Sequence, residues 1–417
     1  MGNLLYVKLE RLLQQVVLVS GTGRHRFWLL GSAIFLWAVY AAGCLFYAYR
    51  QDPWSHGDWL IGYSGGFIRR GLMGEAVFQL SGFSGVPAAW IVVSVQILAS
   101  SIFFFGLAQM ILPKDITLGH LAVLLNPLSV GYVLVDPATA GRKEILLFAL
   151  VVIWQVLETR NSSLSAAKVI LGITLGLITL AHEGLYFFIP LFLIVSILAK
   201  PTLSIRELAQ RLLLLTGPAT LALVFVVAIQ SSATSEQLCS RLLAHGYNTY
   251  TCEGAISAAV VGNADGAIST VAWLIRFPTS YLLYTGFLFT FLLLAMAVAR
   301  TALAMTLKAE FRAFAVVLTV TLLVTTPIFL IAVDWGRFVH VVVVIVSIGV
   351  LSIPIRKHDA DIDVNMSKNH KTLLMACLAS FLSLGVSVSD GQPRSILGNA
   401  FNIGYFLQGG LTPGIFG

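Results

Sequence analysis

Two neighbouring stretches decide the fold: the apolar run FWLLGSAIFLWAVYAAGCLFYA at residues 27–48 and the loop sequence SGGFIRRGL at residues 64–72. The run carries no charged residue and has the length of about 20 residues that a membrane-spanning helix needs. The loop places two adjacent arginines, Arg69 and Arg70, between glycines. Together they predict a membrane-embedded helical protein with two positive charges just outside its first span.

The composition extends this prediction to the whole chain. Its 417 residues are 58% hydrophobic and 11% charged, whereas soluble domains carry roughly 25% charged residues. The formal net charge of +7 does not indicate a nucleic-acid partner, because excess lysine and arginine in membrane proteins mostly mark cytoplasmic segments. Residues 1–26, with Lys8, Arg11, Arg24 and Arg26, are predicted to form an amphipathic segment on the cytoplasmic face.

Apolar stretches of spanning or near-spanning length recur along the chain and predict an all-α bundle of about eleven transmembrane helices. They are residues 27–48, 89–112, 119–135, 144–158, 167–181, 184–199, 211–230, 279–299, 313–333, 338–354 and 372–388. The transmembrane domain is thus 27–388, with outer loops at 49–88 and 231–278 and an outer tail at 389–417. The pairs 167–181/184–199 and 313–333/338–354 nearly touch, so each is either a tight hairpin or one broken helix.

Charge supports one topology. With the N-terminus in the cytoplasm and strict alternation, seventeen of the 26 lysines and arginines lie in cytoplasmic segments and nine lie outside. This bias agrees with the positive-inside rule. We therefore expect a multi-pass protein of the bacterial inner membrane with a cytoplasmic N-terminus.

Four outer groups combine both signs of charge at the mouths of spans. The first loop holds Asp52, Asp58, the double arginine and Glu75. The other groups are Asp136–Glu144, His182–Gly184 and Asp334–Arg337. One topology puts all four on the same side, and ionisable groups at membrane depth usually line a cavity or pathway. The sequence therefore predicts one site on the outer face.

The arginines and lysines of these groups suit an anionic ligand. Arg69 and Arg70 offer planar forks of donors for a phosphate or pyrophosphate, with glycines that let the ligand approach the backbone. The alternative is that they only anchor the chain beside lipid headgroups. Arg142 and Lys143 form a second candidate anion contact. The alternative there is a plain helix start, with Asp136 or Thr139 as its cap and Glu144 in its first turn.

The remaining groups suit proton transfer and sugar binding. His182 or Glu183 is a candidate general base, although a buried histidine at a helix break is the alternative. Asp334 and Arg337 share a helix face if their turn is helical, and Trp335 between them suits stacking on a sugar ring. A structural ion pair is the alternative. Trp54 and Trp59 are interpreted as residues of the membrane-interface belt.

The long outer loop and the cysteines leave two questions open. Residues 231–277 form either a lid or a connector, and Cys239 and Cys252 within them form a disulfide if this side is oxidising, or else remain free thiols. Cys44 and Cys377 lie in apolar runs and are predicted core residues. No Cys/His metal spacing occurs, so no metal or other cofactor is indicated, although carboxylates such as Asp52 and Asp58 are metal-ligand types.

The four motifs in combination, GGFIRRGL at 65–72, GRKE at 141–144, HE at 182–183 and DWGR at 334–337, resemble those of bacterial envelope polysaccharide proteins. The chain is similar to Wzy-type O-antigen or exopolysaccharide polymerases and, more distantly, to GT-C glycosyltransferases. The resemblance implies a polyprenyl-pyrophosphate-linked glycan donor, reaction at the outer leaflet, and a chain-length regulator as a possible partner. The chain departs from many such polymerases in its smaller outer loop. GT-C enzymes usually place an acid in the first outer loop, and Asp52 and Asp58 both qualify, but the resemblance assigns neither to that role.

On this basis the sequence predicts a glycosyltransferase that extends a surface polysaccharide. Arg69 and Arg70, aided by Arg142 and Lys143, would stabilise the leaving pyrophosphate. Glu183 or His182 would take the acceptor proton, with Asp58 and Asp334 as rivals. Trp335 and Arg337 would orient the sugars. The alternatives are a transferase that uses a polyprenyl-monophosphate sugar and a transporter or flippase for lipid-linked glycan.

Overall fold

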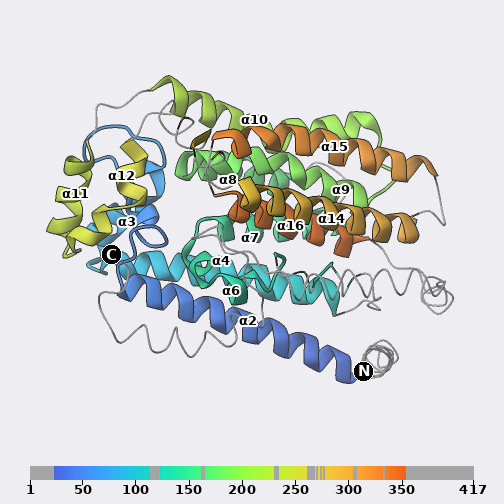
Figure 1. Cartoon of the computed structure of the whole chain (residues 1–417), viewed down its shortest axis with the longest axis horizontal. Coiled ribbons are helices and arrows are strands. Elements are labelled where there is room, and N and C mark those ends of the chain that lie inside the picture. The colour runs from blue at the N-terminus through green and yellow to red at the C-terminus, as the bar shows by residue number, and fades with distance from the viewer. Residues whose placement is uncertain are drawn as a thin grey trace.

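A computed structural model of the chain is helical in every element that it describes (Figure 1). The described residues are 23–112, 120, 123, 124, 126, 128–160, 165–229, 234–260, 268, 271, 272, 275, 278–303, 308–331 and 334–353. The predicted span 372–388, the tail 389–417 and most of the segment 1–26 lie outside them. So does Cys377.

Five described helices are long and apolar enough to cross a membrane. They are α2 (Gly23–Tyr49), α4 (Ala88–Ile111), α10 (Ile205–Ala228), α15 (Lys308–Ile331) and α16 (Trp335–Ser352). Other apolar elements lie among them: α7 (Glu144–Arg160), α8 (Ala166–Ala181), η4 (Glu183–Leu191) with α9 (Phe192–Ala199), and α14 (Pro278–Leu303). The all-α membrane fold is confirmed, whereas the count of eleven spans is not.

In the described part of the predicted span 119–135, residues 120, 123 and 124 are helical and Tyr132–Val135 form the short helix α6. Most other predicted spans coincide with a helix to within a few residues. The largest difference is α10, which begins at Ile205 rather than at 211 because Ser204 and Glu207 form a capping box there.

The pair 167–181/184–199 is a hairpin. Ala181 at the end of α8 accepts a hydrogen bond from Lys143 at the start of α7, whereas Lys168 near the start of α8 contacts Glu158 near the end of α7. The two helices are therefore antiparallel. Trp154 in the second half of α7 donates to Ser196 of α9, so α9 runs parallel to α7 and opposite to α8.

The pair 313–333/338–354 is also a hairpin. Thr325, near the end of α15, donates to Phe187 of η4. Arg337 at the start of α16 contacts Glu144 at the start of α7. Gly349, near the end of α16, lies against Ile194 of α9. Helix α15 therefore arrives at the end of the bundle from which α16 departs.

Helix α16 forms the centre of the bundle. Of its 18-residue apolar window, 94% is buried, compared with 11% for the window in α2. It packs on α9, α14 and α7, while α8 packs on α10. Such burial explains why α16 is a nearly continuous run of valine and isoleucine with no polar face.

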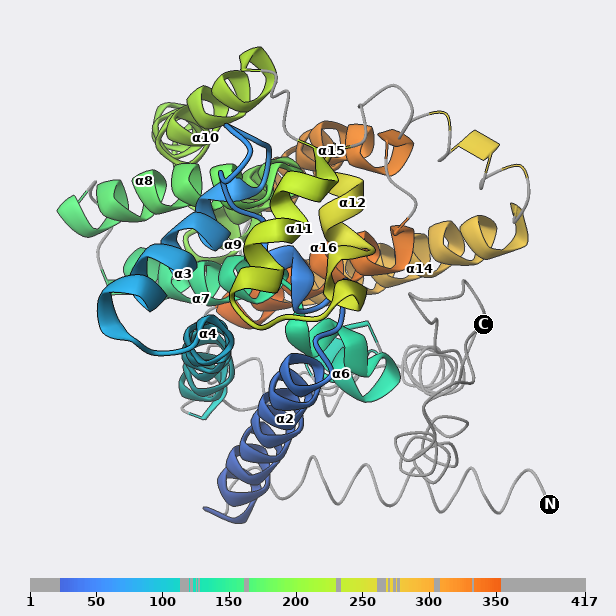
Figure 2. The ribbon, with the colours of Figure 1, turned by 90° about the vertical axis from the view of Figure 1, so that its left-hand side faces the viewer.

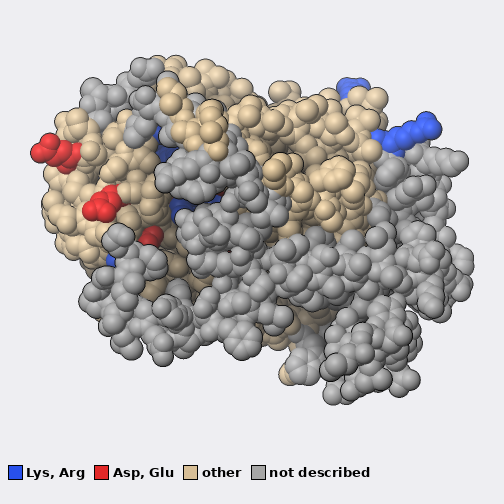
Figure 3. Space-filling model, in the orientation of Figure 1, with Lys and Arg blue, Asp and Glu red and all other residues tan. Residues whose placement is uncertain are grey.

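Several short elements gather at one end of the bundle, which we call the cluster end (Figures 1 and 2). They are η2 (Gly57–Leu60), α3 (Gly71–Ser84), η3 (Pro137–Gly141), α11 (Ser235–Ala244), η5 (Thr249–Cys252) and α12 (Ala255–Val260). They belong mainly to the predicted outer loops 49–88 and 231–278. On the face shown in Figure 3, acidic side chains protrude at this end with some basic atoms partly hidden beside them, and further basic side chains protrude at the opposite end.

Candidate functional site

The double arginine lies in the turn that starts α3. Arg70 precedes the helix with a φ of 66°, which is unusual for a residue other than glycine. The next residue must be glycine, because a Cβ at Gly71 would lie 2.2 Å from the Tyr63 ring. This tight turn directs the Arg70 side chain towards the turn between α8 and η4.

Arg70 there contacts two acids. Its Nε lies 3.0 and 3.1 Å from the two carboxylate oxygens of Glu183, and its Nη2 lies 3.0 Å from one of them. Its Nη1 lies 4.0 Å from Oδ1 of Asp58. Arg69 approaches the same Glu183 at 3.7 Å. The first outer loop is thus joined to the α8–η4 turn by charge.

Lys143 is a second cation that contacts Asp58. Its side chain is fully buried, donates to the carbonyl of Ala181 at 2.9 Å and lies 3.5 Å from Oδ2 of Asp58. Burial alone would raise the pKa of Asp58, but the charges of Lys143 and Arg70 outweigh it and hold that pKa below its usual range. Asp58 is therefore ionised at neutral pH. Its Oδ1 accepts no hydrogen bond from the described residues.

Arg337 forms the other side of the site. Its Nε lies 2.8 Å from Glu144, its Nη1 lies 3.3 Å from Asp334, and its Nη2 lies 3.5 Å from Nε2 of His182. Asp334 is the residue that precedes α16, and its contact with Arg337 is the ion pair that the sequence left as the alternative. His182 is buried at a break where α8 ends in extended backbone, and its Nδ1 has no hydrogen-bond partner in the described part of the chain.

These residues form one charged cluster. It comprises Asp58, Glu144, Glu183, Asp334, Arg69, Arg70, Lys143, Arg337 and His182. Its members come from the first loop, the start of α7, the α8–η4 turn and the start of α16. The four carboxylates are balanced by the four arginine and lysine side chains, which lowers the free-energy cost of burying these charges. An anionic ligand therefore has to compete with the carboxylates for the same cations.

Four other candidates lie apart from the network. Arg142 is half-exposed and donates to the carbonyl of Trp54 at 3.4 Å. Trp335 donates to the carbonyl of Phe329 at 2.6 Å and packs edge-on against that ring. Asp52 accepts from two backbone amides of its own turn, and Asp136 caps η3 rather than α7. Their functional roles stay predictions.

The interpretation of Trp59 as an interface residue is wrong. Its side chain is fully buried, and its Nε1 donates to the carbonyl of Gly141 at 2.6 Å. This hydrogen bond joins the turn that contains Asp58 to the segment that precedes Lys143. Trp54 is 46% exposed, as expected for an interface residue, with its indole against Gly254.

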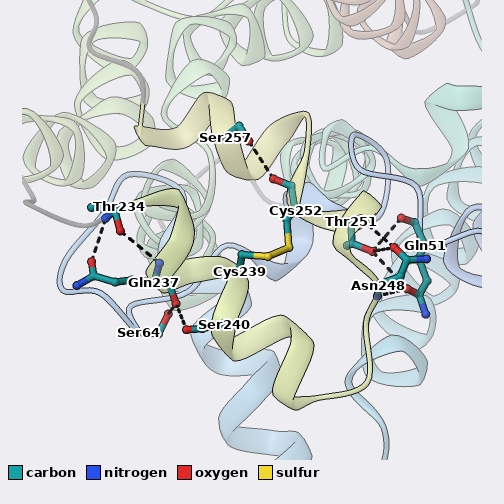
Figure 4. The surroundings of a disulfide bond; sticks show 10 residues. All are labelled: Gln51, Ser64, Thr234, Gln237, Cys239, Ser240, Asn248, Thr251, Cys252 and Ser257. Atoms are coloured by element: carbon teal, nitrogen blue, oxygen red, sulfur yellow. Dashed lines mark hydrogen bonds between the residues drawn. A yellow bond between two sulfur atoms is a disulfide. The ribbon is translucent and has the colours of Figure 1, made fainter. Parts of the chain in front are cut away.

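The second outer loop forms a cap of α11, η5 and α12. A disulfide joins Cys239 to Cys252, which settles the question left open by the sequence (Figure 4). Arg241 of the cap pairs with Glu75 of α3 at 2.5 Å. Arg69 donates to the carbonyls of Ala258 and Ala259, at 2.7 and 3.1 Å, as well as approaching Glu183.

Further bonds hold the cap on the first loop. Gln51 accepts from the backbone of Asn248, and its carbonyl accepts from Thr251 (Figure 4). The amide of Ala255 donates to the carbonyl of Pro53. Because these contacts join segments about 200 residues apart, residues 234–260 are a packed cover of the cluster end rather than a connector.

An apolar groove of about 470 Å³ lies beside the cluster, between α3, α4, α7 and α8. Its lining is Leu72, Met73, Ala76, Val95, Leu98, Ala99, Ile102, Leu146, Ala149, Leu150, Ile153, Thr174, Leu177, Ile178 and Ala181. Leu72 follows the double arginine, and the carbonyl of Ala181 binds Lys143. One end of the groove thus meets the charged cluster.

Two features were missed by the sequence reasoning. The sequence places Glu144 in an outer charged group and in the first turn of a helix, but it does not predict the ion pair that Glu144 forms with Arg337. At the opposite end of the bundle, Glu158, Lys168 and Arg211 form a buried ion triad, with distances of 2.7 and 3.1 Å to one carboxylate oxygen. The sequence assigns Lys168 and Arg211 to cytoplasmic segments by charge alone. Both lie within apolar helices, where an ionisable side chain usually has a charged partner.

No metal site was predicted, and none of the described residues form a group of three or more His, Cys, Asp or Glu side chains suited to a metal. Asp52 and Asp58 do not converge on such a group. What the described residues do contain is a charged cluster, a disulfide-bonded cap and an apolar groove on an all-helical membrane bundle.

These features define an integral membrane protein with a charged site at one end. Residues 27–282 match the model of the family described as uncharacterised membrane protein Rv1490, and the chain belongs to that family. The match includes the first loop, the start of α7 and the α8–η4 turn, whereas Asp334 and Arg337 lie beyond it. No curated protein and no solved structure matches the chain.

Proposed function

We propose that the protein is a membrane glycosyltransferase that extends a surface polysaccharide from a polyprenyl-pyrophosphate-linked glycan. The observation that carries this proposal is the arrangement at Asp58. A buried, ionised carboxylate with one oxygen free of hydrogen bonds among the described residues lies 3.5 Å from Lys143 and 4.0 Å from Arg70. Glycosyl transfer from such a donor uses a base that accepts the proton of the acceptor hydroxyl and cations that stabilise the leaving phosphate.

The carboxylate serves the acceptor. A sugar hydroxyl becomes a better nucleophile when a carboxylate oxygen accepts its hydrogen bond and then its proton. Glu183 is less suited, because Arg70 occupies both of its oxygens. Asp58 retains Oδ1 for this role, so the geometry favours Asp58 over the bases first considered, Glu183 and His182.

The cations serve the leaving group. Negative charge develops on the phosphate as the glycosidic bond breaks, and cations fixed in a water-poor site stabilise it. Lys143 is fully buried and cannot turn to solvent, while Arg70 keeps Nη1 directed towards Asp58. Arg337, 3.5 Å from His182, lies at the side of the site where a sugar would be oriented.

The disulfide supports an outer location for the site. Disulfides persist in oxidising compartments and are rare in the cytosol. Cys239 and Cys252 lie in the cap over the charged cluster, so both would face the outside of the bacterial inner membrane. The start of α2 lies at the opposite end of the bundle, which suits a cytoplasmic N-terminus (Figure 1).

The test uses the purified protein in liposomes with a radiolabelled polyprenyl-pyrophosphate-linked glycan. The proposal expects a ladder of products for the wild type and for Glu236→Gln, a cap variant away from the cluster, and none for Asp58→Asn. Unchanged ladders in Asp58→Asn would contradict the assignment of the carboxylate.

The same assay separates the alternatives. A single mass increment from a polyprenyl-monophosphate sugar would indicate a one-residue transferase. Movement of intact lipid-linked glycan between leaflets, without a new glycosidic bond, would indicate a flippase and overturn the proposal.

A further inference from the structure

The apolar groove has the properties of a site for a hydrocarbon chain. Its volume of about 470 Å³ lies within the range of roughly 300–1,000 Å³ that ligand pockets occupy. Of the residues that line it, only Thr174 carries a polar side-chain group, and that hydroxyl donates to the carbonyl of Ile170 in its own helix. Nothing in the groove therefore offers a free polar partner, and an apolar occupant is favoured.

The groove opens to the side of the bundle. Leu98 of α4 and Leu177 of α8 lie at its rim with 63% and 50% of their surface exposed, while Ala99 and Ile178 are buried. Figure 2 shows α3 between α4 and α8. Both rim residues are exposed leucines on apolar helices, so the opening would suit contact with the hydrocarbon of a bilayer.

Helix α3 places the groove mouth at the membrane surface. Phe83 near its end is 92% exposed, and Trp90 at the start of α4 is 58% exposed. Tryptophan in such a position is typical of the boundary between headgroups and hydrocarbon. The groove extends from this level along α7 from Leu146 to Ile153, which at 1.5 Å per residue is roughly 10 Å.

The cations meet the groove at its surface end. Lys143 lies three residues before Leu146, and its Nζ donates to the carbonyl of Ala181, a lining residue. Arg70 lies two residues before Leu72. A molecule with its chain in the groove would therefore hold its head at these two cations, which suits a phosphate.

We infer that the groove binds the isoprenoid chain of a phosphorylated polyprenyl lipid, which enters sideways from the outer leaflet between α3 and α8. The inference rests on the proposed function for the identity of the lipid. Its volume of about 470 Å³ suits one hydrocarbon chain better than the two chains of a diacyl phospholipid.

The experiment is photolabelling of the full-length protein in liposomes with a benzophenone-bearing polyprenyl phosphate. Labelled peptides are mapped by mass spectrometry. We expect labelling on α4 between Val95 and Ile102 and on α7 between Leu146 and Ile153. Ala76→Trp, which fills the groove from the exposed side of α3, should lower this labelling by about tenfold.

Ala38→Trp is the matched control, because Ala38 is an exposed alanine of α2 that does not line the groove. It should label as the wild type does. Equal labelling of the groove and of α2, or undiminished labelling in Ala76→Trp, would overturn the inference. So would equal labelling by benzophenone-bearing phosphatidylglycerol, which would indicate a general lipid contact.

Photolabelling requires lipid binding but no catalytic turnover, so its outcome tests the lipid site separately from the proposed function. If the wild-type protein forms the product ladder but is not labelled in the groove, the inferred lipid site is contradicted and the proposed function is not. Groove labelling without any glycosyl transfer would support the lipid site and contradict the enzyme.

Discussion

Arg70 and Glu183, 113 residues apart in the chain, form a two-oxygen ion pair in which Nε of the arginine lies 3.0 and 3.1 Å from the carboxylate. The pair joins the turn before α3 to the turn after α8. It also keeps Arg70 in a left-handed backbone conformation, at a φ of 66°. Residues held in such conformations often lie at functional sites, because the surrounding structure has to stabilise them.

Substitution of Arg70 should abolish chain extension while the protein still folds. Arg70→Ala removes the cation proposed to stabilise the leaving phosphate, and we expect no product ladder. Arg70→Gly removes the same side chain but accepts the positive φ, so it should be more stable than Arg70→Ala by about 1 kcal/mol. Thermal unfolding in detergent measures the stability, and the ladder assay measures the activity.

The two variants separate function from strain. If both lose the ladder while Arg70→Gly unfolds at the higher temperature, the side chain is needed for the reaction. A normal ladder in either variant would remove Arg70 from the phosphate site.

Contact between α8 and α10 depends on glycine. A Cβ on Gly172 would lie 2.4 Å from the carbonyl oxygen of Leu214, whereas a Cβ on Gly217, in α10 itself, would meet only a leucine methyl at 3.7 Å. Gly172→Ala should therefore destabilise the protein by about 1–3 kcal/mol. Gly217→Ala should be neutral or stabilise it by up to about 1 kcal/mol. Equal melting temperatures for the two variants would contradict this packing.

The main features of the fold were readable from hydropathy. The apolar runs 89–112 and 144–158 became α4 and α7 nearly residue for residue, because in a bilayer backbone groups must be satisfied within a helix. Composition does not determine whether two adjacent apolar runs reverse direction. The hairpin at His182 is defined by contacts such as Trp154 with Ser196, which depend on the tertiary fold.

For the site, a strict in–out alternation places Asp58, Lys143, Glu183 and Arg337 on one side, and the structure includes all four in one charged cluster. It did not indicate which acid pairs with which base. Glu144 illustrates the difficulty. Its sequence does not distinguish it from any glutamate in the first turn of a helix, and only its distance to Arg337 identifies its partner.

The buried ion triad should contribute to stability without a direct part in the chemistry. Glu158 is fully buried between Lys168 and Arg211. Glu158→Gln removes the shared negative charge and leaves two buried cations, so we expect a loss of about 3–5 kcal/mol. The triple variant Glu158→Leu, Lys168→Met, Arg211→Leu should recover most of this loss, because apolar side chains replace buried ions at little cost. An equally stable Glu158→Gln protein would contradict this contribution of the triad.

The cap should loosen at acid pH. Hydrogen bonds from Arg241 lower the pKa of Glu75 from 4.5 to about 2. A carboxyl group with a lower pKa in the folded state stabilises that state fully above its unfolded pKa, and the contribution is lost as the pH falls towards 2. Amide exchange in α11, corrected for the intrinsic rate, should therefore increase between about pH 5 and pH 3 in the wild type. In Glu75→Gln it should already be fast at pH 5 and change little.

Loss of the disulfide should loosen the cap and leave the bundle intact. Cys239 and Cys252 close a loop with a sequence separation of 13, and a cross-link of this size stabilises by about 3 kcal/mol in the chain-entropy account. The double serine variant should therefore show faster amide exchange in α11 and η5, with exchange in α16 unchanged. In intact cells, a membrane-impermeant thiol reagent should label the wild-type cap only after reduction, because the cap is proposed to face outwards. Labelling without reductant would contradict the disulfide, and no labelling after reduction would contradict the outward orientation.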